Sequence, residues 1–253
     1  MNPENGRRVG VVIPTYNERE NIAALVKGVL RAGRNVHVVV VDDNSPDGTG
    51  EAADELARGE PCSGAQRILQ GEPRVIVVHR YTERGRGTAG RDGFLRCIAE
   101  GFDFIMEMDA DFSHDPSEIP KLLAAARDAD VVIGSRLVPG GQEAGRSLLR
   151  RLTTLAANFY LRHALGVARV RDCTSGFRCF RRQALVSADV RSVKSRGPSI
   201  VTEILFRCRK MRIVEVPIHF RARAAGRSKF NLKAIIEGLL VPPKLWWREI
   251  LGR

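Results

Sequence analysis

The sequence predicts one α/β domain in which helices flank a mostly parallel central sheet. Its 253 residues suit a single sheet wrapped by helices, and 43% of them are apolar, enough for a sizeable core. Short runs of β-branched residues alternate with helical patterns through the first half of the chain, as in repeated strand–helix–strand units. Near-continuous valines at Val38–Val41 indicate a strand that is buried on both faces.

Five strands and three helices are expected in this first half. The strands are expected at Val9–Ile13, Val36–Val41, Val75–His79, Phe104–Met108 and Val131–Gly134. The helices are expected at Asn21–Arg31, Asp47–Ala57 and Thr88–Glu100. Asp115 and Pro116 mark one more helix start, as N-cap and first helical residue, and the Gly-, Pro- and Ser-rich segment Arg58–Pro73 predicts a surface loop.

The second half predicts longer helices at about Ser147–Leu165 and Pro198–Lys210, followed by a strand at Ile213–Phe220. The last segment, Phe230–Trp247, mixes apolar residues, two tryptophans and cations. Pro242-Pro243 interrupts it, so two short amphipathic helices are expected instead of one. An interfacial membrane anchor and a helix packed on its own domain both fit this pattern.

Charge is distributed unevenly along the chain, whose formal net charge is +12. Residues 1–133 hold 16 basic and 22 acidic side chains, a net charge of −6, and residues 134–253 hold 25 and 7, a net charge of +18. A basic half needs an anionic partner such as phosphates, nucleic acid or an anionic membrane surface. The contiguous acidic half argues against a uniformly basic nucleic-acid binder.

Several cellular settings are disfavoured by simple patterns. No run approaches about 18 consecutive apolar residues, so no transmembrane helix is predicted. The short polar N-terminus, Met1–Arg8, lacks the apolar core of a secretory signal. Cysteines are odd in number and lack C-x-x-C spacing, which fits incidental thiols in a reducing cytosol: Cys62, Cys97, Cys173, Cys179 and Cys208.

Polar clusters follow three of the expected strands. They are Pro14–Glu18, Asp42–Gly48 and Asp109–His114. Ligands of open α/β sheets bind beyond the carboxyl ends of the strands, so a site is expected there. Asp109 and Asp111 stand two apart, so both carboxylates can lean to one side and share Mg²⁺ or Mn²⁺ through oxygen ligands.

Four segments together carry a resemblance: Ile13–Glu18, Val41–Thr49, Asp109–Pro116 and Thr174–Arg178. They resemble the inverting GT-A glycosyltransferases of family 2, and more narrowly the dolichol-phosphate (polyprenol-phosphate) mannose synthases, over about residues 9–232. The resemblance implies a GT-A catalytic domain at residues 1–229 and a membrane-associated helical segment at 230–253. It also implies mannose transfer from GDP-mannose to dolichyl or polyprenyl phosphate on the cytoplasmic face of a membrane, with or without a membrane-embedded partner subunit.

The resemblance further implies roles for matching residues. The nucleotide sugar would be bound by Pro14, Tyr16, Glu18, Val41, Asp43, Asp109, Ala110, Asp111, Arg136, Arg223 and Lys229. The metal would be held by Asp111 and Ser113, although some relatives carry glutamine at the latter position. The acceptor phosphate would be bound by Arg136, Arg150 and Thr154. Catalysis would depend on Asp111 and Arg136, and Asp43 suits the N–H edge of guanine or uracil because a carboxylate accepts hydrogen bonds.

The expected reaction needs no general base, because a phosphate monoester is already an anion near neutral pH. A single in-line displacement with inversion at the anomeric carbon is predicted. Arg150 and Thr154 stand one helical turn apart, so both can face one phosphate, and a solvated helix face fits them as well. Thr174–Arg178 and Glu203 fit either the border of the acceptor site or a structural role.

Three other functions are compatible with parts of the sequence. Glucose transfer from UDP-glucose is the nearest. Gly85–Gly90 satisfies the G-x-G-x-x-G pattern of NAD(P)-dependent dehydrogenases, although several residues separate it from its strand and Arg86 stands where the mannose synthases usually carry an aliphatic residue. A nucleic-acid-binding protein could use the basic half, but aromatic residues make up only 6% of the chain and no DNA- or RNA-binding module is recognisable.

Overall fold

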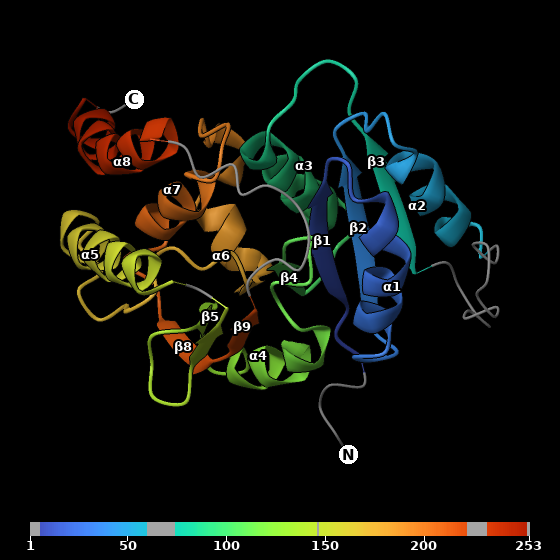
Figure 1. Ribbon diagram of the computed structural model, residues 1–253, viewed down its shortest axis with the longest axis horizontal. Coiled ribbons are helices and arrows are strands. Elements are labelled where there is room, and N and C mark those ends of the chain that lie inside the picture. Colours follow the sequence, from blue (N-terminus) through green and yellow to red (C-terminus); the bar gives the residue numbers. More distant parts are fainter. Residues whose placement is uncertain (1–5, 60–73, 146, 222–231, 252–253) are drawn as a thin grey trace.

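A seven-stranded sheet forms the centre of the molecule in the computed structural model, which describes residues 6–59, 74–145, 147–221 and 232–251 (Figure 1). The strands are β1 (Val9–Thr15), β2 (Val36–Asp42), β3 (Val75–His79), β4 (Phe104–Glu107), β5 (Val131–Ser135), β6 (Gln142–Ala144), β7 (Arg178–Arg181), β8 (Ile213–Pro217) and β9 (His219–Arg221). The sheet order is β3-β2-β1-β4-β7-β5-β8, and β6 pairs with β9 in a separate ribbon.

Helices cover both faces of this sheet. They are α1 (Arg19–Leu30), α2 (Thr49–Ala57), α3 (Arg86–Ala99), α4 (Ile119–Ala125), α5 (Leu148–Ala164), α6 (Arg182–Ser187), α7 (Ile200–Arg207) and α8 (Leu232–Ile250), with 3-10 turns η1 (Pro116–Glu118) and η2 (Val190–Ser192). One core cluster contains residues of α1, α2 and α4, and the other contains residues of α3, α5, α6, α7 and α8.

The valines of β2 alternate between the two core clusters. Val38 and Val40 pack with the α1 side, and Val39 and Val41 pack with the α3 side. All four are fully buried, which confirms the expected strand with two buried faces. Strand β1 lies between β2 and β4 and runs parallel to both, whereas β7 is antiparallel to β4 and β5. The expected mostly parallel sheet is therefore confirmed.

The expected strands and helices are present with small shifts at their ends, and three expectations need correction. The segment 213–220 is two strands, because the chain leaves the main sheet after Pro217 and continues as β9 beside β6. Strands β6 and β7, helix α6 and the 3-10 turn η2 were not expected. Asp115 accepts a hydrogen bond from Ser117 N at 2.9 Å, which confirms it as an N-cap. The expected loop at 58–73 lies outside the described residues beyond Gly59.

The third correction concerns α8, which continues through Pro242-Pro243 as one helix, so the expected break is wrong. Packing supports the helix beyond the prolines: Leu245 is buried in the core cluster that includes α5 and α7. The Trp246 indole also donates a 2.6 Å hydrogen bond to the carbonyl of Ala164, at the end of α5. Among the described residues, none of the helices is long and apolar enough to cross a bilayer.

Four cysteines lie within the described residues, and all four are buried free thiols. Burial raises the pKa of each, to about 12 for Cys173 and Cys208. They are therefore protonated and inert near neutral pH, as expected for incidental thiols. Cys62 lies outside the described residues.

Candidate active site

The three polar clusters meet at one edge of the sheet, because β1 lies between β2 and β4 and all three strands are parallel. Thr15 stands opposite Asp42 in the register, and Val12 stands opposite Glu107. The loops that follow these strands each contain one non-glycine residue in the left-handed region: Asn17 (φ 60°), Asn44 (φ 54°) and Phe112 (φ 58°). Such conformations are uncommon outside glycine and concentrate at functional sites.

Asp42 joins two of these loops. Its carboxylate accepts hydrogen bonds from the Thr15 hydroxyl at 3.1 Å and from the amide and hydroxyl of Ser45 at 2.9 Å and 2.6 Å. The Ser45 hydroxyl oxygen in turn accepts a bond from Asn17 N at 3.1 Å. The first two strand-end loops are therefore fixed to one another before any ligand binds.

Asp43, the predicted base-binding carboxylate, is buried and already bonded. One oxygen pairs with the Arg80 guanidinium, and the other accepts a 2.8 Å bond from Gly85 N. Arg80 also donates to Asp92 of α3 at 2.9 Å. Asp43 thus holds the glycine-rich turn beside the strand ends, a role that its sequence position did not reveal.

The other predicted nucleotide residues differ in exposure. Tyr16 is exposed, with the Arg84 guanidinium 5.3 Å from its ring centroid. Glu18 is buried and accepts a 2.8 Å bond from the Asn21 side chain. Pro14 is the half-buried residue near the end of β1, whereas the Val41 side chain lies in the core. Only the backbone of Val41 is therefore available to a ligand.

The D-x-D pair sits beyond β4 beside an arginine. Asp109 accepts hydrogen bonds from Arg86 at 2.7 Å and 3.1 Å, and Asp111 accepts a 3.0 Å bond from Ser113 N. Arg86 also lies 3.2 Å from Glu107, whose pKa is raised by burial even though Arg86 opposes the shift. Although burial alone would lower the pKa of Arg86, the neighbouring Asp109 and Glu107 raise it. The guanidinium therefore stays charged.

Three further residues of this loop are buried, namely Ala110, Ser113 and His114, whereas Phe112 is exposed. Ala110 lies in the core, and His114 stacks on Phe177 with ring centroids 5.1 Å apart. Burial lowers the pKa of His114, so the ring is neutral near pH 7. The carbonyl of Ser113 accepts a 3.1 Å bond from Arg221 N, which joins the loop to β9.

No group of three or more His, Cys, Asp or Glu side chains arranged to hold a metal occurs in the part of the chain that the structure describes. Magnesium sites in enzymes commonly use one or two carboxylates together with substrate phosphates, and do not need a full set of protein ligands. The hard oxygen donors of Asp109 and Asp111 fit a divalent cation of this kind.

The glycine-rich turn is used for packing against protein. A Cβ on Gly85 would lie 2.6 Å from the Arg196 carbonyl oxygen, and one on Gly87 would lie 2.3 Å from that of Ser195. Gly87 N donates a 2.8 Å bond to Arg196 O, so this amide already has a protein partner. These glycines are therefore explained by close contact with the 195–197 segment and need no dinucleotide.

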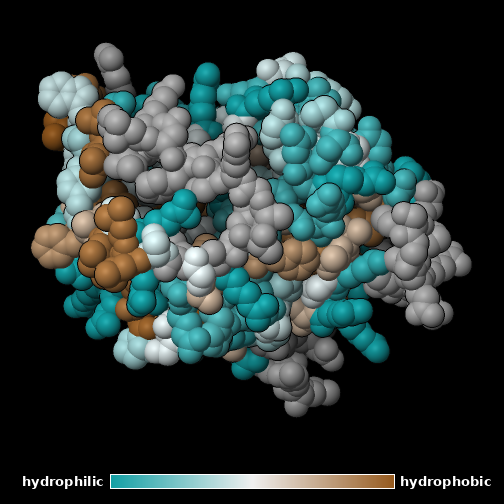
Figure 2. All heavy atoms as spheres, viewed as in Figure 1, coloured by the Kyte–Doolittle hydropathy of each residue, from teal (hydrophilic) through white to brown (hydrophobic). Residues whose placement is uncertain are grey.

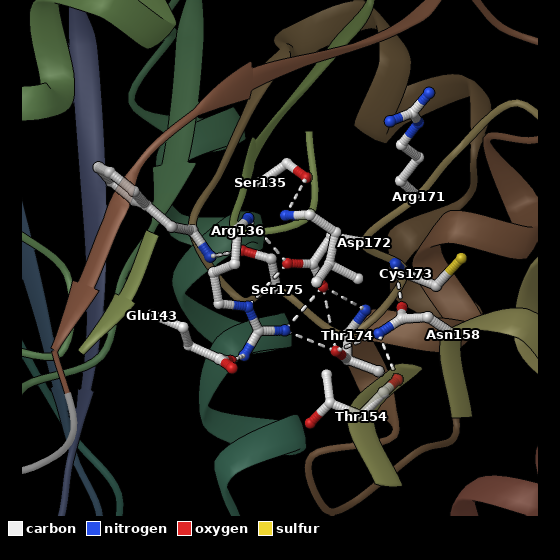
Figure 3. Close-up of polar contacts among 12 residues, drawn as sticks. Ser135, Arg136, Glu143, Thr154, Asn158, Arg171, Asp172, Cys173, Thr174 and Ser175 are labelled. Carbon is white, nitrogen blue, oxygen red and sulfur yellow. Dashed lines mark hydrogen bonds and ion pairs between the residues drawn. The ribbon is translucent and has the colours of Figure 1, made fainter. Parts of the chain in front are cut away.

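Arg136 follows β5 and is the centre of a second polar cluster (Figure 3). Its guanidinium donates two 2.7 Å bonds to Asp172 and one of 2.7 Å to the Thr174 hydroxyl. Glu143 of β6 lies 3.4 Å away, and the guanidinium carbon lies over the Phe220 ring, 5.2 Å from its centroid. This predicted phosphate-binding arginine is therefore held rigidly by two acids.

The Arg136–Asp172 pair is almost completely buried, with side-chain exposures of 8% and 0%. Burial alone would raise the pKa of Asp172, but hydrogen bonds from Arg136 and its charge hold that pKa below the ordinary value. The pKa of Arg136 is raised, because Asp172 and Glu143 outweigh the effect of burial. Both groups are therefore charged over the whole physiological range.

Helix α5 is tied to this cluster by Asn158. The Asn158 amide donates to the Thr174 hydroxyl at 3.3 Å and to the carbonyl of Thr154 at 2.9 Å, and its oxygen accepts a 2.6 Å bond from Cys173 N. The Thr154 hydroxyl donates to the carbonyl of Arg150 at 2.8 Å. The predicted acceptor residues thus lie along one connected set of contacts, which runs from Arg136 to Thr154 (Figure 3) and on to the backbone of Arg150.

Two other predicted border residues are structural supports. Arg178 is fully buried and donates to the carbonyls of Ser175, Val201 and Cys173 at 2.9, 2.6 and 2.8 Å. Glu203 is buried too, and accepts bonds from the amides of Lys194 and Ser195, which hold the segment that packs on the glycine-rich turn. Both residues therefore stabilise the backbone of segments next to the site.

Sequence reasoning missed Arg80, Asp172 and Glu143 as site residues. Asp172 and Glu143 are two of only seven acids in the basic half of the chain, and that rarity was the available signal. Arg223 and Lys229, the predicted diphosphate loop, lie outside the described residues.

Comparisons with known proteins show the family and the fold of the chain. The model of glycosyl transferase family 2 matches residues 10–187. Polyprenol monophosphomannose synthase of Mycolicibacterium smegmatis is 41% identical over 236 residues, which cover 92% of this chain and 84% of that protein. Undecaprenyl-phosphate mannosyltransferase of Micrococcus luteus is 40% identical over 226 residues, covering 88% of each.

A third relative and a solved structure extend the comparison. Dolichol-phosphate mannosyltransferase of Pyrococcus furiosus is 38% identical over 236 residues, which cover 92% of this chain and 62% of that longer protein. Glucosyl-3-phosphoglycerate synthase of Mycobacterium tuberculosis, solved with Mn²⁺, UDP and glucosyl-3-phosphoglycerate, superposes with a TM-score of 0.66 at 20% identity, covering 95% of this chain and 80% of that one. This likeness confirms the expected GT-A fold. The chain is therefore a glycosyltransferase and belongs to glycosyl transferase family 2.

Proposed function

We propose that this enzyme transfers mannose from GDP-mannose to a polyprenyl or dolichyl phosphate, with inversion at the anomeric carbon. The observation that carries the proposal is the pairing of two sites in one fold. A carboxylate cluster at the ends of β1, β2 and β4 suits a metal and a nucleotide diphosphate, and the Arg136 cluster beside α5 suits a second phosphate. Relatives at 38–41% identity that are named for mannosyl transfer to polyprenyl phosphates support the acceptor class and the sugar.

The acceptor phosphate needs charge neutralisation and positioning more than it needs a base. Its oxygen attacks the anomeric carbon while the bond from that carbon to the diphosphate oxygen breaks, and the nucleoside diphosphate departs. Arg136 is fixed by Asp172 and Glu143, so it presents a preorganised guanidinium. Arg150 is exposed one turn before Thr154 and supplies a cation that no acid within the described contacts neutralises.

On the donor side, Asp111 and Ser113 would hold Mg²⁺ or Mn²⁺, as the donor chemistry of this loop allows. When bound, such a cation supplies Lewis-acid stabilisation of the departing diphosphate. Tyr16, Glu18, Asp43 and the backbone at Val41 would form the nucleotide pocket, with Asp109 and Ala110 against the ribose and phosphates. The predicted loop with Arg223 and Lys229 would add cations over the diphosphate.

The exposed apolar residues of α5 and α8 favour binding of the enzyme to a membrane surface. Leu148, Leu152, Leu155 and Phe159 recur at helical spacing on α5, and each is 50–71% exposed. Figure 2 shows hydrophobic side chains gathered at the end of the molecule where Figure 1 places α5 and α8. Exposed Trp247 lies close in sequence to Lys244 and Arg248, a combination suited to a lipid interface.

This arrangement fits a peripheral enzyme on the cytoplasmic face of a membrane. The segment 230–253 then contributes to membrane association while its Leu245 packs into the main core. A membrane-embedded partner subunit is compatible with the same surface.

The decisive experiment combines the protein, Mg²⁺ or Mn²⁺ and a polyprenyl phosphate with labelled GDP-mannose or, separately, labelled UDP-glucose. Lipid-bound label in the organic phase is expected from GDP-mannose, and the product should carry the inverted anomeric configuration. Label from UDP-glucose alone would reassign the sugar and the nucleotide. No label from either donor, or a retained configuration, would overturn the proposal.

A further inference from the structure

Arg86 lies between two carboxylates at the end of β4. Its Nη2 and Nε atoms donate to one oxygen of Asp109, at 2.7 Å and 3.1 Å, and its Nη1 lies 3.2 Å from Glu107. The Arg86 side chain is 26% exposed and that of Glu107 is 2% exposed. The guanidinium therefore lies between the buried Glu107 carboxylate and the surface of the site.

The surrounding backbone leaves room for this guanidinium. A Cβ placed on Gly176 would come within 2.9 Å of Arg86 Nη2, so the guanidinium lies directly against the backbone at Gly176. The tight contacts of Gly85 and Gly87 with the 195–197 segment fix the start of α3, from which Arg86 extends. Arg86 is therefore fixed at both its backbone and its charged end.

The charge of Arg86 acts on the same acids that would attract a cation. Three acids occupy every second position from the end of β4 into the loop that follows it: Glu107, Asp109 and Asp111. The negative charge of each of them raises the pKa of Arg86. A guanidinium bonded to Asp109 and paired with Glu107 cancels part of their field, and it also repels any divalent ion that approaches Asp111.

We propose that Arg86 is a positioning residue that holds Asp109 in place and limits how tightly the D-x-D pair binds a divalent cation. Asp109 is then oriented by the guanidinium, and Asp111 is the carboxylate of the pair that ligates the metal. The inference rests on the proposed divalent-metal site, in which Asp111 is the ligating carboxylate. It goes beyond that site because it gives Arg86 a task, which is to orient Asp109 and to limit metal affinity.

Mn²⁺ alone is the probe, titrated into the full-length protein while free Mn²⁺ is followed by electron paramagnetic resonance. Removing the charge with Arg86→Leu should tighten Mn²⁺ binding, on the order of tenfold. Arg86→Lys should stay within about threefold of the wild type, because it keeps the charge. Arg96→Leu, an exposed arginine of the same helix that pairs only with Glu100 among the described contacts, is the matched control and should leave the affinity unchanged.

The double variant Arg86→Leu/Asp109→Asn separates the two aspartates. It removes one positive and one negative charge, so Mn²⁺ affinity should return to within about threefold of the wild type if Asp109 is not a ligand. A large loss of affinity in the double variant would show that Asp109 binds the metal directly and would overturn the inference. Arg86→Gln, which keeps a hydrogen-bond donor for Asp109, replaces Arg86→Leu if the latter does not fold.

Other outcomes also decide the matter. If Arg86→Leu or Arg86→Gln melts at a lower temperature but binds Mn²⁺ as the wild type does, Arg86 is only a structural ion pair. That result would leave mannosyl transfer intact as a proposal, since activity is measured separately. If the wild type binds no Mn²⁺ either alone or in the presence of GDP, both the metal site and the role of Arg86 are rejected.

Discussion

The hydroxyl of Tyr160 on α5 donates a 2.8 Å hydrogen bond to the carbonyl of Leu239 on α8. In an uninterrupted α-helix that carbonyl would accept from the amide four residues later, at position 243. Pro243 has no N–H, so the helix cannot satisfy Leu239 by itself. Tyr160 replaces the missing donor from a neighbouring helix, which is one reason why α8 continues through two prolines.

Tyr160→Phe removes this donor and keeps the ring. Because both residues are partly exposed and water can reach the carbonyl, the loss should lower the free energy of unfolding by only about 0.5–1 kcal/mol. That corresponds to a melting temperature lower by roughly 1–4 °C, measured by calorimetry. Tyr81→Phe, which alters a more exposed tyrosine, is the control. Equal melting of wild type and Tyr160→Phe would mean that the bond contributes nothing.

Asp172→Asn breaks the buried pair with Arg136. Removing one member of a buried ion pair commonly destabilises by 3–5 kcal/mol, and Glu143 remains near Arg136, so we expect about 3 kcal/mol near neutral pH. Urea unfolding measures this loss. A variant as stable as the wild type would show that Asp172 does not stabilise the fold.

The same pair predicts a pH dependence. The pKa of Asp172 is lower in the folded protein than its ordinary value of 3.8, so its contribution is complete well above that value and is lost as the pH falls through the lowered pKa. The stability gap between wild type and Asp172→Asn should therefore begin to shrink below about pH 5 and keep shrinking as the pH falls past 3.8 toward the lowered pKa. Asp128→Asn, at an exposed carboxylate, should follow the wild type across this range. A gap that is constant or widens on acidification contradicts the assignment.

Asp111→Ala tests the proposed metal ligand. Loss of the metal's stabilisation of the diphosphate should lower transfer to polyprenyl phosphate on the order of a hundredfold or more, with little change in melting temperature. Label in the organic phase measures transfer. Asp128→Ala removes an exposed carboxylate just before β5 and should transfer normally. Full activity of Asp111→Ala would exclude the residue from the reaction.

The sheet and the three clusters at its edge were predictable because they depend on local patterns. Valine runs mark buried strands, and parallel strands bring their carboxyl ends together whatever lies between them. Strand β7 was not predictable in the same way. It begins at Arg178, a charged residue that is buried because the carbonyls of Ser175, Cys173 and the more distant Val201 accept its hydrogen bonds. Those partners are set by tertiary folding and leave no periodic signal.

Partners distant in sequence explain the other features that sequence reasoning missed. The phosphate contact of Arg136 stays a prediction, but its pairing with Asp172 was not foreseen, because it spans 36 positions and depends on how β5 and the loop before β7 pack. Helix α5 was predicted from its periodicity, yet the pattern did not say which side is buried. Asn158 is buried while Leu152 and Leu155 are exposed, the reverse of what hydropathy alone would indicate.

The exposed leucines of α5 predict that this helix contacts the membrane. Leu152→Glu/Leu155→Glu places two carboxylates on the exposed apolar side of α5, where they remove hydrophobic insertion and repel anionic lipid. Neither leucine is in the core, so the fold should be kept. Flotation with vesicles that contain phosphatidylglycerol should show binding weakened by about tenfold or more, because each leucine contributes roughly 1.5–3 kcal/mol when buried. Val186→Glu, at an equally exposed apolar residue of α6, should float like the wild type. Undiminished flotation of the α5 variant would mean that a different surface meets the membrane, since two added charges cannot be accommodated in an inserted apolar face.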